Sequence, residues 1–134
     1  MHLNPYVTFD GTCRAAAEFY ATVFKSEIAE LMTFGEMPDG GAPDPSLSEL
    51  IAHARVPIGD RQLMMSDTGP WSKHEGFHGM TLQLSMDTPE EAAALFAALS
   101  DGGEVSMPLE KTFWARAFGM CRDQFGVAWM VNCD

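Results

Sequence analysis

The chain has 134 residues, a usual length for a single domain of roughly 100–150 residues. Its 19 acidic side chains outnumber 8 lysines and arginines, so the formal net charge is −11. This charge argues against nucleic acid and anionic membranes as partners, because binding to either requires clustered positive charge.

The cysteines and the apolar segments indicate the compartment. Cys13, Cys121 and Cys133 are odd in number and lack C-x-x-C spacing, so we expect reduced thiols in a cytoplasmic protein. The first residues do not combine a basic segment with an apolar run, and no apolar stretch reaches the roughly 18 residues of a membrane span. We therefore expect neither a signal peptide nor a membrane-spanning helix.

The first half of the chain predicts a strand, a helix and three more strands. Residues 4–9 alternate between polar and apolar side chains, as in a strand with one buried face. Residues 14–24 carry apolar side chains at helical spacing, and Thr12 precedes them as the expected N-cap. The strands that follow are expected at 28–34, 50–57 and 62–66.

The second half repeats this order of elements. A strand is expected at 80–86 and a helix at 89–100. Thr88 is the expected N-cap of that helix, Pro89 suits its first turn, and Glu91 completes a capping box. Strands are expected after it at 105–109, 115–122 and 127–132.

The two halves can be aligned as copies of one βαβββ module. Phe19 matches Phe96 at a shift of 77 residues, whereas Leu63 matches Met130 at a shift of 67. The first copy therefore contains about ten extra residues, which we assign to the Gly- and Pro-rich loop at 35–46. Within a single domain over 1–134, we expect module one at about 1–69, a linker at about 70–78 and module two at about 79–134.

Both modules begin with a strand that has one polar and one apolar face. In the first strand Tyr6 and Thr8 alternate with apolar residues, as Gln83 and Ser85 do in the second module. The apolar face is expected to pack against the helices, and the polar face to meet solvent or line a cavity. We predict an α+β fold in which two tandem βαβββ modules form a curved, half-barrel-like mixed sheet around a cleft.

Three sequence segments resemble a known family. They are Asn-Pro-Tyr at 4–6, Lys-Thr-Phe-Trp at 111–114 and Phe-Gly-x-x-Trp-Met-x-Asn-Cys at 125–133. With the repeated module, they resemble the PhnB-like branch of the vicinal oxygen chelate superfamily, which includes glyoxalase I, extradiol dioxygenases and bleomycin-resistance proteins. The resemblance covers nearly the whole chain and implies two modules around a substrate cleft and a homodimer.

The metal-binding positions of the superfamily do not match here. Its members hold a divalent metal with His, Gln or Glu on the first and last strands of the modules. The corresponding positions here offer Asn4 and Tyr6, Thr81, Met130 and the repeat partner of Met130, Leu63. These side chains are poor ligands for divalent metals. The resemblance thus implies the fold and a cleft, while we expect neither a bound metal nor a cofactor.

Several polar residues are candidates for the cleft. His53 and Arg55 are two residues apart on an expected strand and share one face. If this face lines the cleft, His53 can bind a ligand or transfer a proton near neutral pH; otherwise it is an exposed strand residue or a satisfied interface histidine. Gln83 is either an amide that orients a ligand or a solvated side chain.

Two interpretations are open for Trp114 and Arg116. Trp114 and Arg116 can clamp a planar or anionic ligand, or they are a core tryptophan and a surface arginine. Trp129 has the parity of a residue packed under a helix, and Asp67 and Asp123 are interpreted as turn formers. The full set of candidate cleft residues is Tyr6, Thr8, His53, Arg55, Thr81, Gln83, Trp114, Arg116 and Met130.

We expect the protein to bind a small molecule in the cleft without a metal. The alternative is a metal-dependent lyase, isomerase or dioxygenase of the same superfamily, with displaced ligands at His53 or in the loop of His74, Glu75 and His78. A third hypothesis is a structural or interaction protein with a filled cleft. The resemblance also brings the label 3-demethylubiquinone methyltransferase-like, but the chain lacks the glycine-rich strand-to-helix fingerprint of a doubly wound nucleotide-binding domain.

Overall fold

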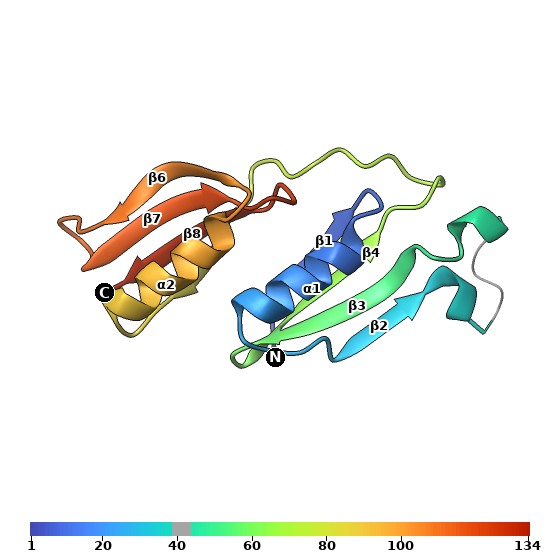
Figure 1. The fold of residues 1–134 in the computed structure, drawn as a ribbon, viewed down its shortest axis with the longest axis horizontal. Coiled ribbons are helices and arrows are strands. Elements are labelled where there is room, and N and C mark those ends of the chain that lie inside the picture. The colour runs from blue at the N-terminus through green and yellow to red at the C-terminus, as the bar shows by residue number, and fades with distance from the viewer. Residues whose placement is uncertain (39–43) are drawn as a thin grey trace. The chain divides into compact units, whose positions relative to one another are not determined.

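A computed structural model of the chain describes residues 1–38 and 44–134 (Figure 1). The chain divides into two compact units, which we call unit 1 (Met1–Glu75) and unit 2 (Gly76–Asp134). Within the described part of the chain, no helix is long and apolar enough to cross a membrane.

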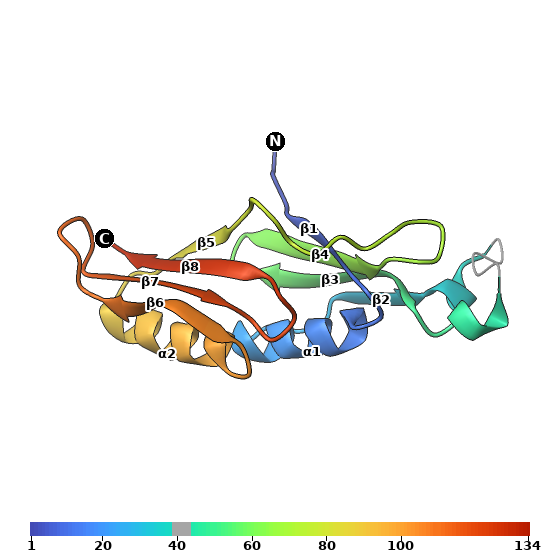
Figure 2. The same cartoon turned by 90° about the horizontal axis from the view of Figure 1, so that it is seen from above.

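Unit 1 is a four-stranded sheet with a helix, α1, on one face (Figure 2). The strand order is β1-β4-β3-β2, with β1 parallel to β4 and the other neighbours antiparallel. The central part of the loop expected at 35–46 lies outside the described residues. The elements of unit 1 are β1 (Tyr6–Phe9), α1 (Cys13–Val23), β2 (Glu30–Thr33), the short 3-10 helices η1 (Phe34–Glu36) and η2 (Pro45–Leu47), β3 (Ile51–Ile58) and β4 (Arg61–Asp67).

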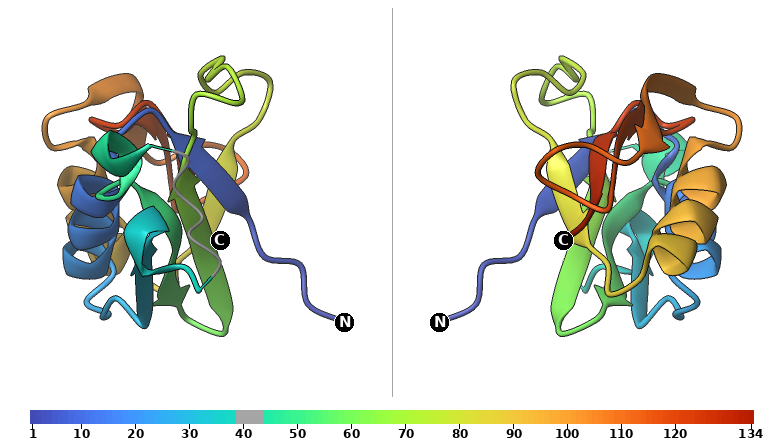
Figure 3. Two further views of the ribbon diagram at one scale, coloured as in Figure 1. Left: turned by 90° about the vertical axis from the view of Figure 1, so that its right-hand side faces the viewer. Right: turned by 90° about the vertical axis from the view of Figure 1, so that its left-hand side faces the viewer.

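Unit 2 has the same topology. Its sheet has the order β5-β8-β7-β6, with β5 parallel to β8, and α2 covers one face (Figure 3, right). This repetition confirms the predicted α+β fold with two tandem βαβββ modules. The elements are β5 (Leu82–Ser85), α2 (Pro89–Ser100), β6 (Glu104–Glu110), β7 (Ala117–Arg122) and β8 (Ala128–Cys133).

Strand pairing corrects the predicted alignment of the two modules by one residue. Tyr6 in β1 pairs with Met64 in β4, and Gln83 in β5 pairs with Met130 in β8. Since Tyr6 and Gln83 match at the 77-residue shift, the counterpart of Met130 is Met64, and the prediction of Leu63 was wrong. The physical reason is hairpin length: eight residues separate the strand partners Arg55 and Met64, but nine separate Met120 and Met130.

The match extends to the next strand of each sheet. Arg55 in β3 pairs with Met64, and Met120 in β7 pairs with Met130. Arg55 and Met120 therefore occupy equivalent places in the two units. This equivalence allows the polar surface of one unit to be compared with the same surface of the other.

Thr12 is the N-cap residue of α1, as predicted, but a buried carboxylate supplies the side-chain hydrogen bond at the start of this helix. Thr12 makes no side-chain capping hydrogen bond. Instead, Oδ1 of Asp67 accepts a hydrogen bond from the backbone N–H of Cys13 at 3.0 Å, and its Oδ2 accepts one from the N–H of Ile51 at 2.9 Å. Asp67 is 4% exposed, so this carboxylate joins α1, β3 and the end of β4 inside the core. The interpretation of Asp67 as a turn former missed this role.

Asp123 has a similar role in unit 2. Its Oδ1 accepts hydrogen bonds from the backbone N–H groups of Phe125 and Val127, and its Oδ2 accepts one from the indole N–H of Trp129 at 2.8 Å. Asp123 does form a turn, as predicted, but it is also 3% exposed and anchors a core side chain. Trp129 is buried, as its parity predicted.

The start of α2 follows the prediction in its first residue and in the Thr88 cap, while the reciprocal Glu91 hydrogen bond of the predicted capping box is not among the contacts of this helix start. The helix begins at Pro89, and Oγ1 of Thr88 accepts a hydrogen bond from the backbone N–H of Glu91 at 3.1 Å. The helix buries Ala92, Phe96 and Leu99. Local residues carry all the signals for this helix start, which explains why the sequence alone could place it.

Candidate functional site

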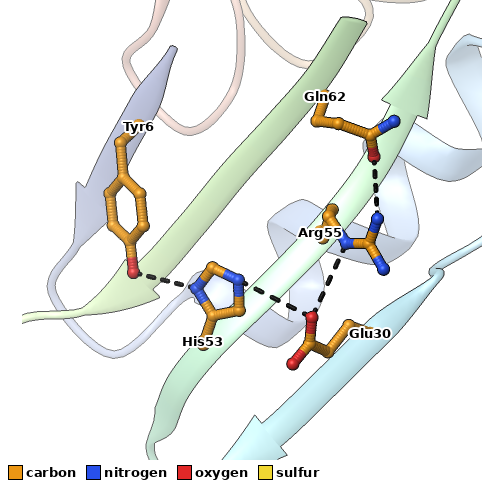
Figure 4. Close-up of polar contacts among 5 residues, drawn as sticks. All are labelled: Tyr6, Glu30, His53, Arg55 and Gln62. Carbon is orange, nitrogen blue, oxygen red and sulfur yellow. Dashed lines mark hydrogen bonds and ion pairs between the residues drawn. The ribbon is translucent and has the colours of Figure 1, made fainter. Parts of the chain in front are cut away.

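Five polar side chains from all four strands of unit 1 lie in a continuous row (Figure 4). They project from the face of the sheet opposite α1, because their neighbours Val7, Ala54 and Val56 are buried on the other face. We call this group the polar row; it consists of Tyr6 in β1, Glu30 in β2, His53 and Arg55 in β3, and Gln62 in β4.

Hydrogen bonds and ion pairs connect the members of the polar row. The Tyr6 hydroxyl lies 3.2 Å from Nδ1 of His53, and the two rings stack with centroids 5.7 Å apart. Nε2 of His53 lies 3.8 Å from Oε2 of Glu30, and Nε of Arg55 lies 3.6 Å from the same oxygen. Nη1 of Arg55 donates a hydrogen bond to Oε1 of Gln62 at 3.5 Å.

The charged members of the polar row remain partly in contact with solvent. The side chains of His53, Arg55 and Glu30 are 30%, 39% and 42% exposed. Ion pairs at this degree of exposure contribute only about 0–1 kcal/mol to stability, because water and salt screen them. Stability of the sheet is therefore a weak explanation for the row.

Unit 2 shows that the module folds without such a row. Glu30 lies opposite Arg55 in the β2–β3 pair, and at the equivalent place Met107 lies opposite Met120 in the β6–β7 pair. One module thus carries an acid–base pair where the other carries two methionines. The topology of the module therefore does not depend on this polar pair.

The same contrast holds for the histidine. His53 lies two residues before Arg55, and Phe118 lies two residues before the equivalent Met120. Phe118 packs edge-to-face against Trp114 at 5.5 Å between ring centroids. The equivalent face of unit 2 is therefore largely apolar at the positions where unit 1 is polar.

The structure brings three of the predicted unit 1 residues together and separates the fourth. Tyr6, His53 and Arg55 are all in the polar row. Thr8 is exposed on β1, and its backbone carbonyl lies 2.9 Å from Nε2 of His74. Glu30 was missed by sequence reasoning, although its pairing with Arg55 across predicted neighbouring strands was the signal that could have found it.

The predicted residues of unit 2 are arranged differently. Gln83 is exposed on β5, where its Nε2 lies 3.5 Å from Oγ of Ser85, and Met130 is its strand partner. Thr81 lies one residue before β5. Trp114 is 51% exposed, so the interpretation as a core tryptophan was wrong.

Arg116 holds the end of the chain. Its Nη2 donates a hydrogen bond to the backbone carbonyl of Asp87 at 2.8 Å, and its Nε donates one to the backbone carbonyl of Asp134. These contacts engage Nε and Nη2 of the guanidinium with backbone carbonyls. A structural role for Arg116 is therefore favoured over the predicted clamp with Trp114.

The metal-dependent alternative has no assembled ligand set in residues 1–38 and 44–134. No three His, Cys, Asp or Glu side chains in this part of the chain come together in a way that could hold a metal ion. In the loop proposed for displaced ligands, His74 is engaged with the carbonyl of Thr8. In the polar row, Glu30 and His53 supply two such groups.

All three thiols are buried, and burial raises the pKa of two of them. Burial raises the pKa of the Cys13 thiol strongly, with a further contribution from the nearby Asp67 carboxylate. Burial, and then the charge of Asp123, raises the pKa of Cys121 to about 11. A nucleophilic cysteine requires the opposite shift, so neither thiol supports cysteine chemistry.

Comparison with known proteins identifies the family. The sequence model described as "3-demethylubiquinone-9 3-methyltransferase" matches residues 1–132. The chain belongs to this family. The YjdN protein of Escherichia coli (strain K12) is 38% identical to it, over 98% of this chain and 95% of YjdN.

Solved structures support the PhnB-like assignment. PA1353 from Pseudomonas aeruginosa is 42% identical, with a TM-score of 0.92 over 100% of this chain and 98% of that one. A Bacillus cereus structure described as a putative 3-demethylubiquinone-9 3-methyltransferase, PhnB protein, is 24% identical, with a TM-score of 0.82 over the full length of both chains. A glyoxalase-related enzyme from Fulvimarina pelagi, 14% identical with a TM-score of 0.65 over 100% of this chain and 89% of that one, shares the fold.

The structural similarities show that the chain has the fold of a PhnB protein and of a glyoxalase-related enzyme. The methyltransferase wording is the label of the family. This label assigns no role to any residue of this chain, including the residues of the polar row.

Proposed function

We propose that this PhnB-like protein binds a small polar molecule on the polar row of unit 1, and that binding needs no metal ion. The observation that carries the proposal is the contrast between the units: Glu30 and Arg55 face each other where Met107 and Met120 do in unit 2. A partly exposed charged cluster that contributes little to stability is available to bind a ligand.

Each member of the row has a part in this proposal. Arg55 supplies guanidinium N–H donors for a carbonyl or other acceptor on the ligand. Tyr6 supplies a ring surface and a hydroxyl, and at 46% exposed it is accessible from solvent. His53 holds the Tyr6 hydroxyl in place through the 3.2 Å contact. Glu30 and Gln62 hold the Arg55 side chain from either side.

A thermal-shift screen with small metabolites and planar antibiotics tests the proposal. A compound that binds the native state raises the melting temperature by mass action. We expect at least one stabilising compound for the native protein and no stabilisation by it of the Arg55→Met variant, which carries the residue of unit 2. A blank across a broad library would contradict the proposal.

A metal arm of the same screen tests the second part of the proposal. Protein purified without chelator is expected to carry less than about a tenth of an equivalent of metal, and Zn, Ni, Mn or Fe(II) is expected to leave its melting temperature unchanged. Stoichiometric metal or a clear stabilisation by one of these ions would favour the metal-dependent alternative.

We further propose that the protein is a cytoplasmic homodimer that does not bind nucleic acid. Exposed apolar side chains support the dimer: Phe113 is 97% exposed and Met107 is 39% exposed. The buried cysteines and the net charge of −11 support the remaining two statements. Light scattering at micromolar concentration tests the assembly, and a monomer mass would contradict it.

A further inference from the structure

The carboxylate of Glu30 lies between the side chains of His53 and Arg55 in the polar row. Nε2 of His53 and Nε of Arg55 lie 3.8 Å and 3.6 Å from the same carboxylate oxygen, Oε2 (Figure 4). Arg55 can only donate, because a guanidinium has no acceptor. The carboxylate of Glu30 can only accept while it is ionised. Glu30 is therefore the acceptor in both its contact with His53 and its contact with Arg55.

The carboxylate also selects the tautomer of His53. Neutral imidazole carries its proton on one nitrogen, and a carboxylate beside Nε2 stabilises the form with the proton on Nε2. Nδ1 then carries a lone pair and must accept the hydrogen bond from the Tyr6 hydroxyl, whose oxygen lies 3.2 Å away. With its proton directed at His53, the Tyr6 oxygen offers only lone pairs to a ligand.

The opposite end of the row has the opposite polarity. Arg55 donates to Oε1 of Gln62 at 3.5 Å, so the amide oxygen of Gln62 is engaged and its NH₂ group remains as the donor. The remaining guanidinium N–H groups of Arg55 are donors as well. One end of the row thus presents an acceptor, at Tyr6, and the other end presents donors, at Arg55 and Gln62.

The charges of the polar row also restrict the class of ligand. The positive charge of Arg55 faces the negative charge of Glu30 directly across the β2–β3 pair, at 3.6 Å between Nε and Oε2. A ligand carboxylate would approach a pair whose charges largely cancel, on a chain whose net charge is −11. An acceptor without a full charge, such as an amide carbonyl, avoids this repulsion and still binds the donors.

We propose that Glu30 sets the direction of the hydrogen bond between His53 and Tyr6, so that the site, with the donors of Arg55 and Gln62 at its other end, takes an uncharged ligand with a donor for Tyr6 and an acceptor for Arg55 and Gln62. A primary or secondary amide belongs to this chemical class. The inference rests on the proposed binding function and deepens it, because it assigns the ligand class and gives Glu30 the role of a specificity-determining residue.

The tautomer of His53 tests the direction of the Tyr6–His53 hydrogen bond in the absence of any ligand. ¹⁵N NMR of the imidazole at about pH 8.5, where an ordinary histidine is neutral, distinguishes the two tautomers. We expect the proton on Nε2 in the native protein and a mixture of both tautomers in Glu30→Met. The exposed Glu27 lies outside the polar row, and Glu27→Met is the matched control that should leave the native tautomer unchanged. A proton on Nδ1 in the native protein would overturn the inference.

Benzamide and benzoate test the ligand class, because they share a ring and differ in charge and in donor groups. We expect benzamide to shift the His53 and Arg55 resonances at concentrations roughly tenfold lower than benzoate, a difference of about 1.4 kcal/mol. In Glu30→Met the order should reverse, since Arg55 is then uncompensated. Tighter binding of benzoate to the native protein would refute the ligand class.

The two readouts separate the failure of this inference from the failure of the proposed function. If some uncharged or charged compound stabilises the protein but His53 carries its proton on Nδ1, the binding function stands and the assigned direction is wrong. If neither benzamide nor benzoate shifts any resonance of the polar row and the metabolite screen is blank, the binding site itself is refuted.

Discussion

Arg55 and Glu30 lie directly opposite each other in the β2–β3 pair, with Nε and Oε2 separated by 3.6 Å. The equivalent positions of unit 2 are Met120 and Met107, which are also strand partners. The chain thus contains its own control for the role of this charged pair, because an identical module topology is built without it.

Replacing the pair by the residues of unit 2 is expected to remove binding and to preserve the fold. The double variant Glu30→Met/Arg55→Met should change the free energy of unfolding by less than about 1 kcal/mol, since exposed ion pairs contribute little. Urea unfolding measures the stability, and the metabolite screen measures the binding. A stability loss above about 3 kcal/mol would show that the pair is structural.

Asp123→Asn should destabilise unit 2 strongly. The carboxylate accepts hydrogen bonds from Phe125, Val127 and Trp129, whereas an amide directs an NH₂ group at one of these donors. Leaving buried donors unsatisfied costs about 1–3 kcal/mol each, and we expect a loss in that range by denaturant unfolding. Asp101→Asn, at an exposed site, is the control. Equal stability of the two variants would refute this role of Asp123.

Asp67→Asn should destabilise the protein more than Thr12→Ala does. Asp67 accepts hydrogen bonds from the N–H groups of Cys13 and Ile51, while Thr12 makes no capping hydrogen bond. We expect a loss of about 1–3 kcal/mol for Asp67→Asn and less than about 0.5 kcal/mol for Thr12→Ala. Faster hydrogen exchange at Cys13 and Ile51 in Asp67→Asn would locate the effect, and a larger loss in Thr12→Ala would contradict it.

The Cys121 thiol should resist alkylation near neutral pH. Burial and the charge of Asp123 raise its pKa to about 11 from an ordinary value of 9.0, so only about 0.1% of it is thiolate at pH 8. Iodoacetamide labelling followed by mass spectrometry should be slow at pH 8 in the folded protein and fast in urea. Rapid labelling of the folded protein at pH 8 would contradict the predicted shift.

The same shift fixes the sign of a stability change at high pH. Because the folded state keeps the proton of Cys121 to a higher pH than the unfolded state, the contribution of this group is complete below pH 9.0 and is lost as the pH rises to about 11. Between these pH values, the free energy of unfolding of the wild type should fall relative to that of Cys121→Ala. A rise would contradict the predicted sign.

Most of the fold could be predicted from local patterns in the sequence. The alternation of buried Val7 and Phe9 with exposed Tyr6 and Thr8 follows the predicted two-residue period, and α2 starts where Thr88 predicts. These features depend on residues a few positions apart, so a single sequence contains them. The repeat of the two modules followed from the same patterns.

Contacts between distant residues were beyond the reach of these patterns. Asp67 meets Cys13, 54 residues earlier, and nothing local distinguishes it from a turn former. Glu30 enters the polar row through the register in which β2 pairs with β3, and strand parity alone does not determine this register. The error of one residue at Leu63 arose from hairpin length, another feature that strand parity does not determine.

The central claim is that the polar row of unit 1 binds a small polar molecule. Saturation-transfer NMR with one metabolite library, applied to the native protein and to Glu30→Met/Arg55→Met, tests it most directly. We expect at least one compound to bind the native protein and to lose this binding in the variant. Compounds that bind both proteins equally, or no binding to the native protein, would contradict the claim.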